Sequence, residues 1–282
     1  MNINKIFTVL LLILLSSKGI SQNKTLIYKT VNDTINLKLK IINPTTSKPQ
    51  KTACAIFLSG GGWINFSWNQ LNEIAYGLSD QGLTSIIVEY RTTKKHNSTP
   101  FESLQDVKDA IVFLRKNADS LKINQNQIIA IGSSAGAHLA FSSYITDEPG
   151  ENKTLNSKPN YIIGISPVIR NDETGYAYER IGEKYKSFSP FYLYLNTDKR
   201  LPHSLIFSGE NDPLIDFNDL KKIHEKSIEK NDKIELYSID KVGHSMKRKY
   251  KSIYIQMYPI IIDFLKSNNI ILDSFVNKVK NN

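Results

Sequence analysis

The sequence predicts an α/β fold: a mostly parallel central sheet with helices on both faces. Two observations lead to this expectation. Short runs of continuous apolar residues, typical of strands buried on both sides, alternate with segments whose apolar residues recur at helical spacing. No internal repeat and no linker rich in proline, glycine or serine divides the 282 residues, so we expect one domain.

The expected elements follow in order along the chain. The first two strands, Leu26–Tyr28 and Ile35–Ile42, are close enough to pair antiparallel. The later expected strands are Ala53–Leu58, Ser85–Val88, Ile128–Ile131, Tyr161–Ile165, Ser204–Phe207 and Ile234–Ser238. The expected helices are Asn69–Leu78, Ser103–Ala118, Ala135–Tyr144, Leu220–Ile228 and Ile253–Leu265. The stretch 171–200 breaks the alternation; it would form either a small lid over a pocket or a surface loop with a short helix.

The N-terminus has the three-part layout of a secretory signal peptide. The cation of Lys5 is followed by the apolar run Ile6–Leu15, and Gly19 and Ser21 occupy the −3 and −1 positions of a cleavage site. We therefore expect residues 1–21 to be removed and a mature domain of residues 22–282, secreted or periplasmic. An uncleaved anchor is the alternative, although the run is about half of the roughly 20 residues that span a bilayer. No later apolar run has spanning length, so we expect no stable membrane insertion after cleavage.

Composition sets broad limits. With 40% hydrophobic and 22% charged residues the chain can bury a sizeable core and does not resemble a disordered protein. The formal charge is +9, but apart from Lys247–Lys251 the cations are spread along the chain, which favours a solvated surface over a nucleic-acid partner. Cys54 is the only cysteine and lies in an expected strand, so we expect a small buried side chain.

Gly132-Ser133-Ser134-Ala135-Gly136 matches the pattern G-x-S-x-G. The expected strand Ile128–Ile131 precedes it and an expected helix follows, which is the context of a nucleophile elbow. Glycines allow strand and helix to turn sharply against each other, and the helix N-terminus favours a developing negative charge. The sequence thus predicts Ser134 as a nucleophile.

Ser59-Gly60-Gly61-Gly62-Trp63 follows another expected strand. Consecutive glycines let backbone N–H groups approach a reacting carbonyl, as in the oxyanion loops of lipases and esterases. A phosphate-binding loop is the other chemical possibility, but no Lys-Ser/Thr pair follows the glycines. A simple flexible turn also remains open. We expect Trp63 to line the substrate pocket.

Together these segments resemble the esterase branch of the α/β hydrolases. The glycine loop, the Glu89-Tyr90-Arg91 strand end, the helix from Asp106 to Leu114 and the GSSAGAHLA elbow are similar to those of BD-FAE and hormone-sensitive-lipase-like esterases, which include acetyl-xylan and feruloyl esterases. The resemblance covers roughly residues 30 to 266. One position departs from it: the family's loop usually begins with a histidine that helps to hold the loop, whereas this chain has Ser59.

The acid and base are expected after the serine, in the fold's order of serine, acid and histidine. Asp212 lies in Gly209-Glu210-Asn211-Asp212, which resembles the family's G-x-x-D loop, and Glu210 and Asp216 are rivals for the role. His244 lies in Val242-Gly243-His244-Ser245 after the last expected strand, as the family's histidine does.

The other four histidines fit the role of base less well. His96 and His203 precede the expected positions, and His224 lies on an expected surface helix. His138 comes four residues after Ser134, one turn into the elbow helix, where a packing role is expected.

The resemblance implies acyl transfer, and the sequence contains no metal-binding cluster or cofactor fingerprint, so we expect no metal or cofactor. His244 would take the proton of Ser134, Asp212 would orient the imidazole, and the N–H groups of Gly61, Gly62 and Ala135 would bind the oxyanion. The expected function is hydrolysis of short-chain or carbohydrate-linked acetyl or feruloyl esters. Two alternatives stay open: an amidase or peptidase with the same triad, and a catalytically silent fold that binds a ligand such as a saccharide.

Overall fold

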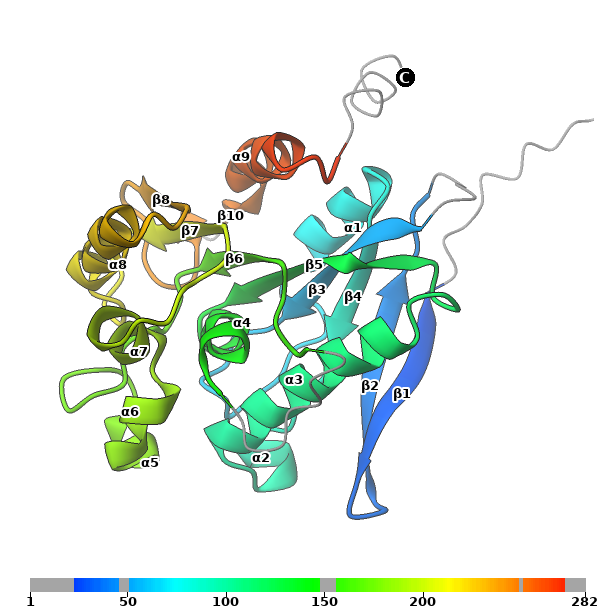
Figure 1. Cartoon of the computed structure of the whole chain (residues 1–282), viewed down its shortest axis with the longest axis horizontal. Helices are drawn as coiled ribbons and strands as arrows, with labels where there is room; N and C mark the ends of the chain where they lie inside the picture. The colour runs from blue at the N-terminus through cyan, green and yellow to red at the C-terminus, as the bar shows by residue number, and fades with distance from the viewer. Residues whose placement is uncertain (1–22, 46–50, 148–155, 249–250, 272–282) are drawn as a thin grey trace, which may run out of the picture.

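The computed structural model describes residues 23–45, 51–147, 156–248 and 251–271. It confirms the predicted fold class. Eight strands form one sheet in the order β1-β2-β4-β3-β5-β6-β7-β8 (Figure 1). They are β1 (Lys24–Val31), β2 (Ile35–Ile42), β3 (Thr52–Leu58), β4 (Thr84–Val88), β5 (Ile123–Ser133), β6 (Tyr161–Ile165), β7 (Ser204–Gly209) and β8 (Ile234–Ile239). The predicted signal peptide, residues 1–21, lies outside the described residues.

The first two strands form the antiparallel edge of the sheet. β1 pairs with β2 and β2 with β4 in antiparallel register, as predicted for the opening pair. All pairs from β4 to β8 are parallel. Successive residues of β3 enter opposite cores: Ile56 packs on one face of the sheet, and Ala55 and Phe57 pack on the other. Burial on both faces explains why these strands read as continuous apolar runs.

Helices cover the two faces unequally (Figure 1). One core contains side chains of α3 (Pro100–Lys116), α4 (Ala135–Ile145), α7 (Pro190–Asn196) and α8 (Phe217–Lys230). The other contains side chains of α1 (Asn72–Asp80) and α9 (Tyr254–Ser267). All five predicted helices exist, with shifted ends. α3, for example, begins at Pro100 because Thr99 and Glu102 form a capping box around a proline at the first helical turn.

The stretch that broke the predicted alternation folds into short helices. It contains α5 (Tyr178–Ile181), a 3₁₀ turn η1 (Gly182–Lys184), α6 (Tyr185–Phe188) and α7. The last of these packs between α4 and α8, and Phe188 and Tyr194 are buried (Figure 1). Sequence periodicity did not predict α5, α6 and α2 (Thr93–His96), nor the pair β9 (Lys247–Arg248) and β10 (Lys251–Ser252), because each is too short for its apolar pattern to repeat.

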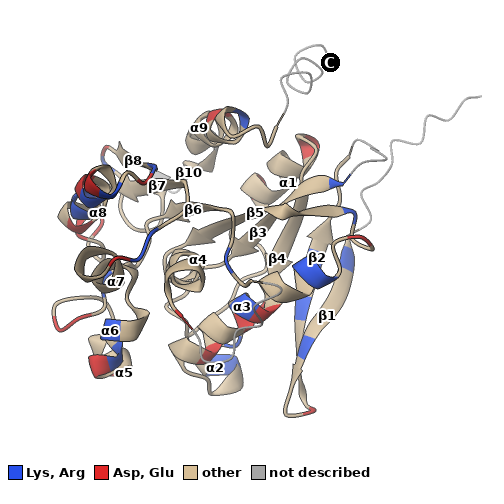
Figure 2. Cartoon of the chain, viewed as in Figure 1, with Lys and Arg blue, Asp and Glu red and all other residues tan. Residues whose placement is uncertain are grey.

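Charged residues of both signs are interspersed along α8. Figure 2 shows lysine, aspartate and glutamate following one another on this helix. This mixture fits the interpretation of the positive charge as a solvated surface.

A buried ion-pair cluster joins the antiparallel edge to α3. The carboxylate of Asp106 is fully buried and accepts hydrogen bonds from Nε of Arg91 at 2.8 Å, from the backbone N–H of Arg91 at 2.9 Å and from Nζ of Lys29 at 2.6 Å. Burial acts to lower the pKa of Arg91, but the hydrogen bond and negative charge of Asp106 raise it above its ordinary value. The cluster fixes the end of β4, from which the chain enters α2.

We predict that Asp106→Ala lowers the free energy of unfolding by about 3–5 kcal/mol, because it leaves the buried guanidinium of Arg91 without its main partner. Urea titration followed by circular dichroism measures the change. The matched control is Asp119→Ala, which breaks an exposed ion pair with Lys51 and should change the midpoint far less. Equal midpoints for the two variants would contradict a structural role for the cluster.

Candidate active site

Ser134 occupies a strained turn between β5 and α4. Its backbone has φ 52° and ψ −119°, a region that side-chain-bearing residues rarely adopt. The turn is possible because a Cβ at Gly132 would collide with the backbone of α4, and a Cβ at Gly136 would collide with the carbonyl of Leu58 at the end of β3. The two glycines of the motif therefore let the helix start directly against two strands, with the serine at the apex.

The structure brings the three residues predicted as nucleophile, base and acid into one hydrogen-bonded chain. Nε2 of His244 lies 2.8 Å from Oγ of Ser134, and Nδ1 of His244 lies 2.9 Å from Oδ2 of Asp212. The carboxylate of Asp212 is buried and also accepts the backbone N–H groups of Leu214 and Ile215, at 2.9 and 3.1 Å. Such an arrangement can transfer the serine proton to the imidazole and hold the resulting charge.

The two rivals for the acid make other contacts. Glu210 accepts a hydrogen bond from the Ser238 hydroxyl, and Asp216 caps the N-terminus of α8 by accepting the N–H of Asn218. Only Asp212 of the three is bonded to His244 in the described part of the chain.

The loop that carries Asp212 packs against the loop that carries His244. A Cβ at Gly209 would collide with the carbonyl of Val242, and that carbonyl accepts the N–H of Asn211 at 3.1 Å. Burial acts to raise the pKa of Asp212, but hydrogen bonds from His244 and from the Leu214 backbone outweigh it and lower the pKa below its ordinary value. Asp212 therefore stays ionised and can partner an imidazolium.

The glycine loop lies against the serine. A Cβ at Gly60 would lie 3.1 Å from Cβ of Ser134, and the N–H of Gly60 donates to Oε1 of Gln70. The three N–H groups predicted to bind an oxyanion make no hydrogen bond to any described protein group; they belong to Gly61, Gly62 and Ala135. Free backbone donors beside a helix N-terminus suit a developing negative charge.

Ser59, which stands where the resembled family has a histidine, is buried and hydrogen-bonded. Its Oγ accepts the N–H of Ser67 at 3.2 Å, and its carbonyl accepts the hydroxyl of Tyr90 at 2.6 Å. These bonds fix the start of the glycine loop.

The expectation that Trp63 lines the substrate pocket was wrong. Its side chain is 0% exposed and packs edge-on against His138, with ring centroids 5.0 Å apart, and beside Phe188. The indole is therefore part of the core beneath the loop. The aromatic neighbours that bury it come from α4 and α6, which no local pattern around the tryptophan could indicate.

His138 has the packing role that the sequence predicted. The ring is fully buried, and Nε2 donates to Oδ1 of Asn171 at 3.1 Å. Burial lowers the pKa of His138 to about 3, against a smaller raising effect of the bond to Asn171.

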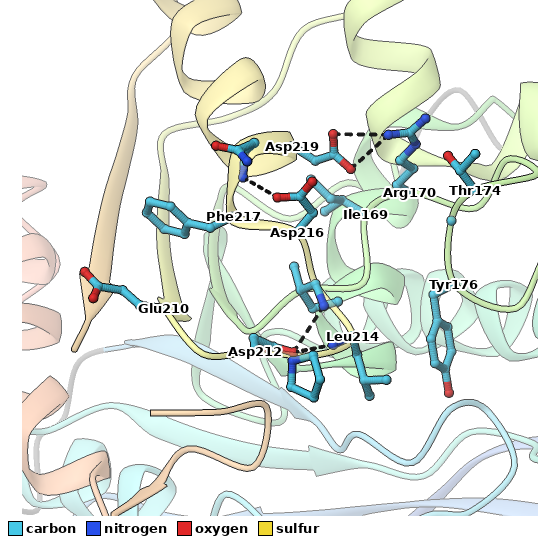
Figure 3. A pocket seen from close by; sticks show the side chains of 14 residues that line it. Ile169, Arg170, Thr174, Tyr176, Glu210, Asp212, Leu214, Asp216, Phe217 and Asp219 are labelled. Carbon is cyan, nitrogen blue, oxygen red and sulfur yellow. Dashed lines mark hydrogen bonds and ion pairs between the residues drawn. The ribbon is translucent and has the colours of Figure 1, made fainter. Parts of the chain in front are cut away.

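A pocket of about 610 Å³ opens beside Asp212 (Figure 3). Its walls are the loop 169–176 and the segment 210–219 that leads into α8. Side chains on both walls combine apolar surface with polar groups, for example Tyr176, Leu214, Asp216 and Phe217. The sequence did not indicate that these residues line a pocket, because the two walls are brought together only by the fold.

Among the described residues, no group of three or more histidine, cysteine, aspartate or glutamate side chains could hold a metal ion. No helix in the described ranges is both long and apolar enough to cross a membrane.

Comparison with known proteins finds similarity to esterases. Residues 39–169 match the family model BD-FAE. Esterase 2 of Thermogutta terrifontis has the same fold: the apo structure has a TM-score of 0.81 and 26% identity over 89% of this chain and 96% of that one. The propionate-bound structure of the same esterase has a TM-score of 0.79 and 25% identity over 88% of this chain and 95% of that one.

Curated relatives match over shorter stretches. Esterase LipC of Mycobacterium tuberculosis is 33% identical over 92 residues, which are 32% of this chain and 22% of that protein. Endo-1,4-beta-xylanase B of Butyrivibrio fibrisolvens is 27% identical over 126 residues, which are 42% of this chain and 20% of that protein. The match thus spans only about a fifth of the length of either relative.

The burial of His138 predicts a specific pH dependence of stability. An unfolded histidine binds a proton near pH 6.5, whereas the folded chain binds it near pH 3. The contribution of neutral His138 is therefore complete above pH 6.5 and falls by about 1.4 kcal/mol per pH unit between these values. In His138→Gln, the loss of unfolding free energy from pH 7 to pH 5 should be smaller by about 2 kcal/mol, measured by urea titration. Equal losses in both proteins would refute this.

Proposed function

We propose that Ser134, His244 and Asp212 form the catalytic triad of a carboxylesterase in this α/β-hydrolase chain, whose residues 39–169 match the family model BD-FAE. The observation that carries the proposal is the hydrogen-bonded chain from Oγ of Ser134 through His244 to Asp212, with the serine held on a strained elbow. The esterase relatives support the same type of reaction.

The proposed reaction has two acyl-transfer steps. Nε2 of His244 takes the proton as Oγ of Ser134 attacks the ester carbonyl, and the imidazolium then protonates the leaving alcohol. Water, deprotonated by the same nitrogen, releases the acid from the acyl-enzyme. Asp212 keeps Nδ1–H directed at itself, so that Nε2 faces the serine in the neutral ring. The free N–H groups of the glycine loop and of Ala135 receive the oxyanion.

We propose an ester of a short acid with a carbohydrate alcohol as substrate. The pocket beside Asp212 supports the alcohol side, because aromatic rings and polar groups together suit a sugar: Phe217 and Tyr176 contribute rings to its lining, and Thr174 and Asn218 contribute polar side chains. A short acyl group is suggested by the relative with bound propionate or butyrate. The partial match to a xylanase points to a polysaccharide context.

We also propose that the protein acts outside the cytoplasm. The charged start, the apolar run Ile6–Leu15 and the small residues Gly19 and Ser21 support export with cleavage before Gln22.

Ser134→Ala should lower kcat for p-nitrophenyl acetate by roughly 10⁶, because it removes the nucleophile. Asp212→Asn should lower it by up to roughly 10⁴, because the imidazole loses its orienting partner. Circular dichroism should show that both variants keep the fold. Glu210→Gln, the matched acid control, should retain kcat within a few-fold. Activity of Ser134→Ala within tenfold of the unmodified enzyme would sink the assignment.

Esters of sugars should be preferred over esters of simple alcohols. We expect kcat/KM for acetylated or feruloylated xylo-oligosaccharides to exceed that for the methyl esters of the same acids by at least about tenfold. Phe217→Leu keeps apolar bulk but removes the ring, and it should reduce this ratio without slowing methyl-ester hydrolysis. A ratio that is near one, or that the substitution leaves unchanged, would argue against the pocket as a sugar site.

Export should leave a protein that starts at Gln22. When the full chain is expressed in a Gram-negative host, intact mass spectrometry of the periplasmic or culture fraction should give the mass of residues 22–282. Recovery of the 282-residue chain in the membrane fraction would instead support an uncleaved anchor.

A further inference from the structure

We infer that Arg180 is a positioning residue that holds the glycine loop in the orientation needed to bind the oxyanion. This inference rests on the proposed function. Arg180 lies on α5, within the segment 171–200. It is 118 positions away from Gly62 in the chain, yet the two residues are in contact.

Two contacts define the position of the guanidinium. Nη1 of Arg180 donates a hydrogen bond to the carbonyl of Gly62 at 2.8 Å. Its central carbon lies 5.4 Å from the ring centroid of Trp63, the next residue of the loop, in cation–π geometry. The Arg180 side chain thus contacts both the backbone of Gly62, a proposed oxyanion donor, and the side chain of the following residue, Trp63.

The hydrogen bond from Arg180 completes the restraint of a flexible residue. Gly62 has φ 60° and carries no side chain, so the peptide planes on its two sides could rotate. The plane that contains its N–H is held at the Gly61 carbonyl, which accepts the N–H groups of Ile64 at 3.0 Å and Asn65 at 3.1 Å. Among the described residues, Arg180 makes the one hydrogen bond to the Gly62 carbonyl, which lies in the following plane. With both planes held, the position of Gly62 and the direction of its N–H are fixed.

The rest of the loop is anchored from other elements. Gln70 binds the N–H of Gly60, and the start of α2 donates to the loop's end, with the N–H of Thr93 3.0 Å from the Trp63 carbonyl. Ser59 bonds to the N–H of Ser67 and does not reach the middle of the loop through any described bond. The Gly62 carbonyl is therefore the point at which the segment 171–200 holds the loop, in a chain that lacks the family's histidine at position 59.

The segment that carries Arg180 is itself tied to the nucleophile helix. Nδ2 of Asn171 donates to the carbonyl of Tyr176 at 3.0 Å, while its Oδ1 accepts from His138 on α4. A Cβ at Gly62 would lie 2.7 Å from Oη of Tyr176, so this tyrosine also closes over the glycine. The positions of the loop, the segment and the serine are thus coupled through buried contacts.

Arg180→Ala tests the inference with short esters, which leave the sugar pocket empty. We expect kcat for p-nitrophenyl acetate to fall about 10- to 100-fold, because a loop displaced by a fraction of an ångström aims its donors poorly. KM should change less than about threefold. The affinity for phenylboronic acid, whose tetrahedral serine adduct places an oxygen in the oxyanion site, should fall by a factor similar to that of kcat. Arg180→Lys, which keeps the charge but loses the planar donor pair, should be intermediate.

Lys184→Ala is the matched control. Lys184 also joins the segment to the body of the fold by a cation–π contact, with Nζ 5.1 Å from the ring of Phe101, but it does not touch the glycine loop. It should leave kcat and boronate affinity within twofold. Tm should shift by a similar small amount in Arg180→Ala and Lys184→Ala.

Three results would overturn the inference: kcat of Arg180→Ala within twofold of the unmodified enzyme, an equal loss in Lys184→Ala, or a fall in kcat with unchanged boronate affinity. If Arg180→Ala does not fold, Arg180→Lys carries the same test. An unmodified enzyme inert on esters would instead refute the proposed function. An active enzyme that is indifferent to Arg180→Ala would refute only the positioning role.

Discussion

The close approach of α4 to the end of β3 is the constraint on which the site depends. Gly136 allows the first turn of the helix to rest on the carbonyl of Leu58, with no side chain between them. This contact puts the start of the helix beside the glycine loop, since the loop follows Leu58 directly in the chain. It also fixes the apex of the elbow. The packing of the start of α4 on the end of β3 holds Ser134 in its strained backbone conformation. Any side chain at position 136 would push the nucleophile away from the donors that must act with it.

A second close approach of backbone to a glycine occurs between the loops that carry Asp212 and His244. Gly209 at the end of β7 lies against the carbonyl of Val242, which precedes the histidine loop. Because β3, β5, β7 and β8 are parallel, their carboxyl ends lie at one edge of the sheet, and the loops that follow them converge there. Ser134 and His244 are 110 positions apart, but the sheet and these glycine contacts bring their side chains to 2.8 Å. The side chains of the proposed triad can therefore react together only because the backbone packing brings their loops into contact.

Local patterns in the sequence were sufficient for the sheet. Each residue of the proposed triad follows an expected strand, but the acid and the base were predicted from the loops and the residue order of the resembled family. Local patterns did not predict the features that depend on contacts between residues distant in the sequence. The helices α5, α6 and α7 are too short to show a period. Trp63 appeared to be a pocket residue, yet His138 and Phe188 from distant helices bury it. Arg180 belongs to no recognisable sequence motif. It contacts Gly62 only because the segment 171–200 folds back over the glycine loop.

The central claim is that Ser134 is a covalent nucleophile activated by His244. The most direct measurement is to incubate the folded enzyme with a fluorophosphonate probe and to locate the adduct by peptide mass spectrometry. We predict one stoichiometric adduct, on Ser134, whose formation slows by orders of magnitude in His244→Ala. An enzyme that hydrolyses esters while Ser134 stays unmodified, or that carries the adduct on another residue, would contradict the claim.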